Sequence, residues 1–421
     1  MTELRRSGRS SRRVLIIVQN LPVPLDRRVW LECQALTAAG YGVSVICPMG
    51  PGDAAFEDLD GVRIHRYPPP PQAEDASGYV REFAYCWFQT ARLAFREYRQ
   101  AGFGVIQACN PPDTYFALAA LFRPLGVRFV FDHHDLCPEV YTARFGRAGG
   151  LLHRGLLLLE RLTFRLADRV ISTNDSYREV AIGRGRRTPE EVTVVRSGPD
   201  LERLRRRAPE PVLKAGKPFL CAYLGVMGPQ DGVDTVLEAA FVIVHEMGRR
   251  DCHFVMMGFG DCFEELRAQA RRDGLDGWVT FTGRADDETL TRYLSTADIG
   301  LSPDPKNAFN DVSTMNKTVE YMAFGLPVVA FDLKETRVSA GDAAAYAPDG
   351  DVAAYAKAIV SLLDDPARRE AMGAAGRERV VDSLAWEHQA PKYVAVYREL
   401  LDGARLQLVP SVVAERGARA A

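Results

Sequence analysis

The segment SPDPKNAFNDVSTMNKTVEYMAFGLPVVAFD, residues 302–332, combines a polar loop, the start of a helix and a buried strand. Ser313 or Thr314 is expected to cap this helix, and Lys317 then lies one turn inside it. The unpaired amides and the dipole of a helix start favour a bound anion. Glu320 shares the face of Lys317, where it either forms a surface ion pair or accepts hydrogen bonds from two neighbouring hydroxyls, such as those of a ribose. The segment therefore predicts a ligand with phosphate and hydroxyl groups.

The same alternation of strand and helix recurs along the chain. Residues 324–327 end the helix, and the apolar run 328–331 is typical of a strand buried on both faces. Repetition of this unit predicts an α/β protein with two doubly wound domains. Further strands are expected at residues 14–18, 42–47, 105–108, 128–132, 169–172, 192–195, 219–224, 253–257, 279–282 and 299–302. A helix is expected to open at Asp26, its N-cap, and to close at Gly40, and another is expected after residues 110–113. Further helices are expected at 151–166, 233–247, 262–272, 287–296, 352–363, 366–381 and 386–401.

The composition limits the class of protein. A chain of 421 residues, 47% hydrophobic and 26% charged, is long enough for two globular domains. The formal net charge of −2 argues against bulk binding of nucleic acid. No apolar run predicts a spanning helix or a signal peptide. The eight cysteines stand singly, which favours a reducing cytoplasm and argues against a structural zinc.

A change in composition divides the chain. Residues 201–217 carry four arginines, two prolines and a Gly-Lys pair, and we interpret them as a linker. They separate an N-terminal domain, residues 1–200, from a C-terminal domain, residues 218–385. Residues 386–405 form a final helix beyond the second domain, and residues 406–421 are expected to be a loose tail.

Glycine-rich loops follow the first strands of the C-terminal domain. The loop 225–232, GVMGPQDG, lies where glycines let the backbone approach a phosphate, and a plain turn is the alternative. The segments 258–261 and 281–284 follow the next two strands and are either tight turns or walls of a ligand pocket.

Two adjacent histidines lie at the end of the strand 128–132 in the first domain. Adjacent strand residues point to opposite faces, so His133 and His134 do not easily reach one metal ion, and one of them is expected to face the cleft. A structural role in the core is the alternative. Asp113 and Glu139 are expected nearby, because they follow strand ends of the same sheet.

These landmarks, in this order, resemble the retaining glycosyltransferases of family 4, over residues 13–400. The resemblance implies the GT-B fold, in which two Rossmann-like domains face each other and the last helix crosses back onto the first domain. It further implies that residues 313–317 and the loop 225–232 bind the diphosphate of a nucleotide sugar, and that His134 lies at the sugar.

The resemblance assigns three groups of residues. The catalytic residues it implies are His134, Lys317 and Glu320. The donor-binding residues it implies are Gly225, Met227, Gln230, Gly258, Gly260, Gly283, Arg284, Ser313, Thr314, Met315 and Asn316. The residues expected on the acceptor side are Asp113, Asp135 and Glu139.

The phosphate loop departs from the family pattern. Most members carry an Arg and a Lys in or near the loop 225–232, and this chain has neither in the loop. Lys317, the amides of residues 313–316, and Arg27 or Arg28 of the other domain are expected to compensate the diphosphate charge instead.

The acidic pattern departs as well. The family's Glu-x7-Glu spacing places acids at positions 312 and 320, but position 312 is Val. Either Asp311 takes the place of the first acid, or backbone groups of residues 312–316 hold the transferred sugar.

The helix expected at residues 79–98 carries aromatic side chains on one face, with Arg81, Arg92 and Arg96 on or beside it. It either packs on its own domain or, together with the basic N-terminus, touches anionic lipid at the inner face of the plasma membrane.

The resemblance predicts a glycosyltransferase that moves a hexose or N-acetylhexosamine from a donor, expected to be UDP-linked, to a glycan or lipid-linked acceptor in cell-surface polysaccharide synthesis. No metal or other cofactor is expected, because no Asp-x-Asp pair stands in the donor segment. A binding-only scaffold with a degenerate site and a nonhydrolysing sugar-nucleotide epimerase are the alternatives.

Overall fold

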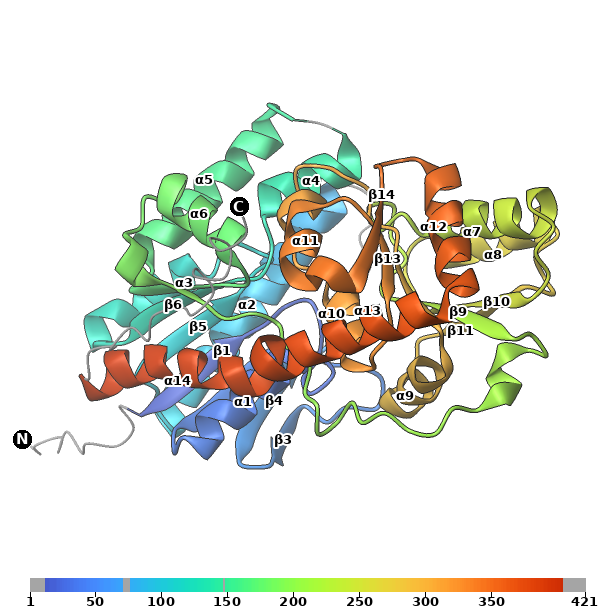
Figure 1. The fold of residues 1–421 in the computed structure, drawn as a ribbon. Coiled ribbons are helices and arrows are strands. Elements are labelled where there is room, and N and C mark those ends of the chain that lie inside the picture. Colours follow the sequence, from blue (N-terminus) through green and yellow to red (C-terminus); the bar gives the residue numbers. More distant parts are fainter. Residues whose placement is uncertain (1–11, 71–75, 147, 404–421) are drawn as a thin grey trace, which may run out of the picture.

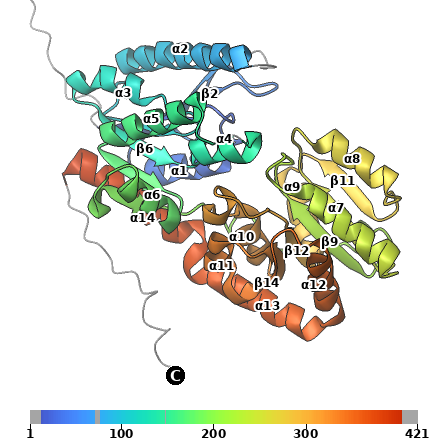
Figure 2. The same ribbon diagram turned by 90° about the horizontal axis from the view of Figure 1, so that it is seen from above.

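The computed structural model describes residues 12–70, 76–146 and 148–403. It shows two α/β domains side by side (Figure 1, Figure 2), as predicted. The expected tail, residues 406–421, and the arginines before residue 12 lie outside the described residues.

The first domain is built on an eight-stranded sheet with the order β3-β4-β2-β1-β5-β6-β7-β8. Its neighbouring strands are parallel except for β3 and β4, which form an antiparallel hairpin at one edge. The strands are β1 Arg13–Ile17, β2 Gly42–Pro48, β3 Phe56–Leu59, β4 Val62–Tyr67, β5 Val105–Cys109, β6 Arg128–His133, β7 Arg169–Ser172 and β8 Val192–Val194.

Helices cover both faces of this sheet. Side chains of α2, α3 and α5 pack on one face, and side chains of α1 and the final helix α14 pack on the other. Asp26 caps α1 as predicted, accepting a hydrogen bond from the amide of Val29. The helices are α1 Arg27–Ala38, α2 Ala76–Gln100, α3 Phe116–Phe122, α4 Cys137–Phe145, α5 Leu151–Leu166, α6 Asp175–Gly183 and α14 Trp386–Asp402.

The second domain has a six-stranded parallel sheet with the order β11-β10-β9-β12-β13-β14. The strands are β9 Phe219–Leu224, β10 Cys252–Met257, β11 Val279–Gly283, β12 Ile299–Ser302, β13 Val328–Phe331 and β14 Ala344–Ala347. The helices are α7 Val233–Phe241, α8 Phe263–Arg272, α9 Asp287–Thr296, α10 Asn316–Ala323, α11 Lys334–Ala340, α12 Val352–Asp364 and α13 Pro366–Arg379.

Each sheet has a point where its strand order reverses. In the first sheet β1 lies between β2 and β5, and in the second β9 lies between β10 and β12. Loops that leave neighbouring strands in opposite directions open a crevice at the carboxyl ends of those strands. The loop 225–232 after β9 and the loop 303–315 after β12 border this crevice in the second domain.

The final helix α14 returns to the first domain, as the resemblance predicted (Figure 1). Where it begins, the amide of Trp386 donates to the carbonyl of Pro199, so the two chain crossings between the domains run side by side. A Cβ at Gly198 would lie only 2.2 Å from the carbonyl oxygen of Leu384. Only glycine allows this approach.

The predicted start of one helix is wrong. The helix α10 begins at Asn316 with Met315 at its N-cap position, and neither Ser313 nor Thr314 caps it. Lys317 is therefore its second residue and not one turn inside. The helix expected at 233–247 is helical throughout, but its last turn, Val242–Glu246, is a π-helix.

Six helices and strands were absent from the prediction: β3, β4, β14, α4, α6 and α11. The β3–β4 hairpin turns at Asp60-Gly61, where both residues have positive φ (51° and 80°). An Asp-Gly pair is a strong hairpin signal, so this element was available to sequence analysis.

The predicted helix at 79–98 is part of α2, which packs Cys86, Leu93 and Ala94 into the core of its own domain. In the described part of the chain, no helix combines the length and hydropathy that a membrane span requires. All eight cysteines are unpaired.

Candidate active site

Lys317 is held at the carboxyl edge of the second sheet by a buried ion pair. Its Nζ lies 2.6 Å from Oδ1 of Asp304, which is 2% exposed and follows β12 directly. Burial alone would lower the pKa of Lys317, but the carboxylates of Asp304 and Asp231 outweigh it and raise the pKa. The ammonium group is therefore fixed and charged. Lys317 does not pair with Glu320, which excludes the surface-pair alternative.

The chain that enters α10 offers backbone donors. Within residues 12–70, 76–146 and 148–403, the amides of Thr314, Met315 and Asn316 have no hydrogen-bond acceptor. They lie beside Lys317 at the positive end of the α10 dipole, an arrangement that suits an anion.

The hydroxyls of Ser313 and Thr314 contact the other domain. Ser313 Oγ donates to the carbonyl of Phe309 at 2.7 Å and lies 2.9 Å from the hydroxyl of Tyr177 in α6. Thr314 Oγ1 accepts from Nδ2 of Asn174, the residue that caps α6. These bonds to the first domain, which the sequence does not reveal, are the reason that neither hydroxyl caps α10.

The two glycine loops of the second domain pack against each other. A Cβ at Gly258 would lie 1.8 Å from the carbonyl oxygen of Gly225, and one at Gly260 would lie 2.6 Å from that of Met227. Met227 is fully buried, its amide donates to the carbonyl of Phe259, and its carbonyl accepts from the amide of Cys262, so this residue supports the loop and has no group free for a ligand. Gln230 accepts from Asn310 through its carbonyl group.

The segment 281–284 adjoins these loops. The carbonyl of Gly283 accepts from the amide of Gly258 at 2.9 Å. Arg284 is exposed, and its guanidinium group lies 4.9 Å from the ring centre of Phe259. The donor-binding residues predicted at 258–260 and 283–284 are thus neighbours in space.

Glu320 faces the first domain across the crevice. Arg27 contacts both its Oε1, at 3.4 Å, and Oδ1 of Asp287, at 2.7 Å. Burial raises the pKa of Glu320, although Arg27 and Arg203 act against that rise. A cavity of about 100 Å³ beside Glu320 is lined by Arg27, Arg28, Leu31, Ser197, Gly198, Pro199, Asp200, Arg203, Leu204, Asn316 and Trp386.

Asp311 does not supply the missing acid in this arrangement. Its Oδ1 accepts from the amide of Lys334 at the start of α11, at 2.9 Å, and lies 3.5 Å from Nζ of Lys306. The carbonyl of Val312 accepts from Asn174. The free amides that follow are the nearer candidates to hold a sugar.

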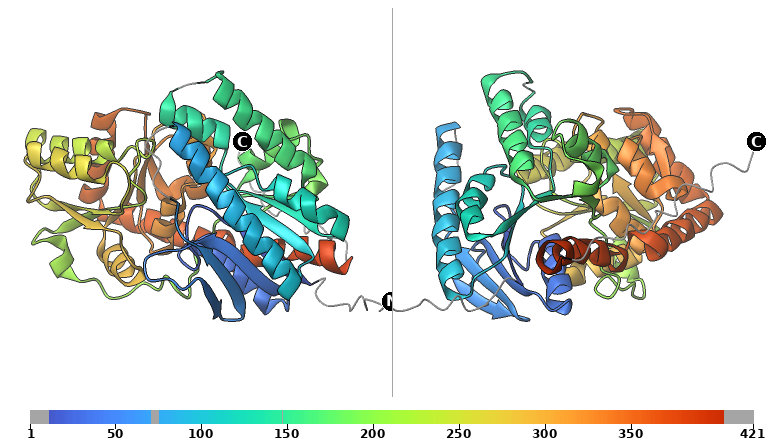
Figure 3. Two further views of the ribbon diagram at one scale, coloured as in Figure 1. Left: turned by 180° about the vertical axis from the view of Figure 1, so that it is seen from behind. Right: turned by 90° about the vertical axis from the view of Figure 1, so that its left-hand side faces the viewer.

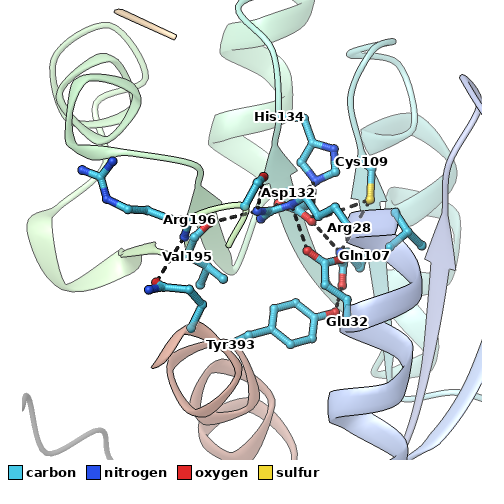
Figure 4. Close-up of polar contacts among 12 residues, drawn as sticks. Arg28, Glu32, Gln107, Cys109, Asp132, His134, Val195, Arg196 and Tyr393 are labelled. Atoms are coloured by element: carbon cyan, nitrogen blue, oxygen red, sulfur yellow. Dashed lines mark hydrogen bonds and ion pairs between the residues drawn. The ribbon is translucent and has the colours of Figure 1, made fainter. Parts of the chain in front are cut away.

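The two histidines point to opposite faces, as predicted. His133 is buried among the rings of Phe131, Phe164 and Tyr177, and burial lowers its pKa to about 3. His134 is 17% exposed and belongs to a polar cluster (Figure 4). His133 is the core residue, and His134 is the one available to a ligand.

The His134 cluster is centred on Asp132. Nε2 of His134 lies 2.8 Å from Oδ2 of Asp132 and 2.9 Å from Nε of Arg28. Glu32, Cys109, Asp132 and His134 offer ligand atoms within 4.8 Å of one another, a spacing that suits a metal ion. The guanidinium group of Arg28 contacts Glu32, Asp132 and His134 and supplies a fixed cation among them.

The three residues expected on the acceptor side differ in position. Asp113 is only 3% exposed, so its carboxyl group lies inside the domain and not at the surface of the crevice. Asp135 is half-buried next to His134, and burial raises its pKa. Glu139 pairs with Arg184, which also pairs with Glu160. Only Asp135 adjoins His134.

Residues that the sequence analysis did not name complete the site. Asp304, Asn174 and Tyr177 hold Lys317, Thr314 and Ser313. Asp304 follows a buried strand at the edge where ligands bind, which is a signal available in the sequence. Asn174 and Tyr177 lie about 140 residues from their partners and gave no local signal.

Two Rossmann-like domains, with Lys317 and free backbone amides on one and a polar cluster on the other, form the arrangement of a GT-B protein. A model described as "Glycosyl transferase 4-like domain" matches residues 25–198, and one described as "Glycosyl transferases group 1" matches residues 218–365. The chain therefore belongs to the GT-B glycosyltransferases of family 4.

Individual relatives agree with this assignment. A phosphatidyl-myo-inositol mannosyltransferase of Mycobacterium leprae is 33% identical over 43% of this chain, which spans about half (46%) of that relative's length. A D-inositol 3-phosphate glycosyltransferase of Catenulispora acidiphila is 26% identical over 68% of this chain and 70% of its own. The solved sucrose-phosphate synthase of Thermosynechococcus elongatus, at 20% identity, has a TM-score of 0.74 and covers 93% of this chain and 100% of its own.

We expect Asp113 to make stability depend on pH. Burial raises its pKa to about 7, and in the described chain its Oδ2 has no partner. The folded protein then keeps a proton that the unfolded chain releases near pH 4, so stability falls as pH rises through this window. Between pH 5 and pH 7.5, the wild-type protein should lose about 2 kcal/mol more unfolding free energy than the variant Asp113→Asn. Urea unfolding of both proteins measures it, with the exposed Asp58→Asn as control. If the unfolding free energy of variant and wild type changed equally with pH, the raised pKa of Asp113 would be contradicted.

Proposed function

We propose that this glycosyltransferase moves a sugar from a nucleotide-diphosphate sugar to a glycan or lipid-linked acceptor, with retention of configuration. The observation that supports it most is the fixed ammonium group of Lys317 beside three free amides at the reversal point of the second sheet. These donors match the charge and the hydrogen-bonding needs of a diphosphate.

The donor-side residues take distinct parts in this proposal. Lys317 and the amides of Thr314, Met315 and Asn316 stabilise the diphosphate as it leaves. Preorganised donors need no rearrangement during the reaction, so this stabilisation supplies much of the rate. Glu320 accepts hydrogen bonds from the ribose, and the loops at Gly258 and Gly283 line the base.

Arg27 takes part in the same proposal from the facing domain. It pairs with both Glu320 and Asp287 and lies near enough to the crevice to face the nucleotide. Arg28, in contrast, is committed to the cluster around Asp132. Of the two arginines expected to compensate the missing Arg and Lys of the phosphate loop, Arg27 is the better candidate.

The acceptor enters from the side of His134. Its attacking hydroxyl approaches the sugar on the face that the diphosphate leaves, and the departing phosphate oxygen takes the hydroxyl proton. This course retains configuration and uses no metal ion. Structures of the related Anabaena protein HepE in complex with UDP and with UDP-glucose support a uridine nucleotide.

One observation weighs against the epimerase. An epimerase needs an acid and a base on both sides of the sugar, and His134 with Asp135 supplies titratable groups from one side only. A binding-only scaffold would use the same diphosphate site as a transferase, so an assay of sugar transfer separates these two functions.

The first domain carries an apolar surface that fits the proposed contact with a membrane. The helices α2 and α5 lie on the same face of the sheet (Figure 3), and they expose Phe88 (63%), Leu151 (87%) and Leu152 (65%). Arg81 and Arg92 on α2 and Arg154 on α5 accompany them. Apolar side chains among arginines suit an anionic lipid surface, and this supports the proposal that the enzyme works at the cytoplasmic face of the plasma membrane.

We expect Lys317→Ala to abolish donor binding, because the ammonium group contacts the diphosphate. Its loss also leaves Asp304 buried without a partner, so the variant Lys317→Met with Asp304→Asn removes both charges and separates binding from folding. Calorimetric titration with uridine, guanosine and adenosine diphosphates measures affinity, with the exposed Lys306→Ala as control. Wild-type affinity in the double variant would refute the diphosphate site.

For His134→Ala we expect transfer to fall by at least about 100-fold while donor affinity stays within about twofold, because the imidazole acts on the sugar and not on the nucleotide. The assay incubates the protein with radiolabelled nucleotide sugars and a membrane extract. Label in lipid or glycan supports transfer, conversion of the sugar without acceptor indicates an epimerase, and binding without turnover indicates a scaffold.

Replacing Leu151 and Leu152 by Ser should weaken binding to vesicles that contain phosphatidylglycerol by at least about tenfold, because each leucine contributes about 1.5–3 kcal/mol when buried. Co-sedimentation with vesicles measures the bound fraction. Val212→Ser, at a residue 78% exposed in the linker, is the matched control. Equal binding by the leucine variant and the control would remove α5 from the proposed surface.

A further inference from the structure

The final helix α14 reaches the middle of the first sheet through two tyrosines. Tyr393 and Tyr397 are fully buried, and both hydroxyls donate to Oε1 of Gln107, at 2.5 Å for Tyr393. Gln107 lies in β5, one of the two central strands where the strand order reverses. Figure 4 shows Tyr393 pointing from α14 toward Gln107.

The other end of the Gln107 amide binds two acids. Its Nε2 donates to Oδ2 of Asp132 at 2.7 Å and to Oε2 of Glu32 at 2.8 Å. Two accepted and two donated bonds use the full capacity of a primary amide. A reversed amide would place its oxygen against the acids and its NH₂ against two donating hydroxyls. The tyrosines therefore fix which way Gln107 points.

The fixed amide in turn holds the carboxylate that contacts His134. Oδ2 of Asp132 accepts from Gln107 and lies 2.8 Å from Nε2 of His134. Burial opposes ionisation of Asp132, but His134 and Arg28 keep its pKa below the usual range, whereas burial and Asp132 raise the pKa of Glu32. The two acids therefore differ in how readily they ionise, and both contact the guanidinium group of Arg28.

We propose that Gln107, Tyr393 and Tyr397 are positioning residues that orient His134 through Asp132 and Arg28, since Asp132 accepts from Arg28 and Nε of Arg28 donates to Nε2 of His134. This inference rests on the proposed function, in which His134 faces the transferred sugar. The final helix thereby completes the catalytic side of the first domain, although its residues lie about 290 positions along the chain from Gln107.

Docking of α14 does not depend on the two hydroxyls. The rings of Tyr393 and Tyr397 pack in the core together with Trp386 and Val396. Asp402 accepts from Tyr41, and Glu399 pairs with Arg169 at the same interface. Phenylalanine at positions 393 and 397 keeps the packing and removes only the hydrogen bonds to Gln107.

The test is the double variant Tyr393→Phe with Tyr397→Phe. We expect kcat to fall by about 10–100-fold with the donor KM within about twofold, because a displaced imidazole affects the chemical step and not donor binding. The ring resonance of His134, assigned with His134→Gln in the protein labelled at histidine, should shift at constant pH. Tyr41→Phe removes one hydrogen bond from the same interface and should change neither quantity.

An unmoved His134 resonance in the double variant, or unchanged kcat, would overturn the inference. A melting temperature equal to that of Tyr41→Phe establishes that the helix is still docked, and Tyr397→Phe alone repeats the comparison if the double variant fails to fold. Should the wild-type protein transfer no sugar at all, the proposed function fails by itself, and the resonance comparison still decides whether the tyrosines orient His134.

Discussion

A buried ammonium group needs a compensating charge, and the pairing of Lys317 with Asp304 meets this need at the edge of the second sheet. Asp304 is fixed by its position just after β12, so the pair determines where α10 begins relative to the sheet. The start of α10 in turn sets the positions of the free amides of residues 314–316 and of the carboxylate of Glu320. A change in the pair would therefore move the whole donor side of the crevice.

The segment that leads into α10, residues 313–315, and the helix itself also connect the two domains. Ser313 and Thr314 bond to α6, and Glu320 contacts Arg27 in α1. The residues nearest the proposed diphosphate are thus also the residues that hold the first domain in place. Binding of a charged ligand and the spacing between the domains are consequently coupled, because both use the same side chains and the same short loop.

Local patterns predicted most of the fold. The helix 151–166 and the strands 169–172, 219–224 and 299–302 have the predicted bounds, since each is a compact apolar unit between clear breakers. The alternation of side chains along a strand also predicted that His133 and His134 point to opposite faces of the sheet. The start of α10 was wrong because the hydroxyls that could cap it bond to another domain. The contact between Gln107 and Tyr397 has no local signal, since it depends on how α14 docks.

The return of α14 has a consequence for the order of folding during synthesis. Val394, Val396 and Tyr397 belong to the same core as Val14 and Val45, although they are among the last described residues to leave the ribosome. Helix α1 covers part of this face of the sheet, but the part beneath α14 stays exposed in the nascent N-terminal domain until the second half of the chain has been translated. A chain that stops shortly before residue 386 would keep that face open to chaperones and to aggregation, even with every proposed site residue already made.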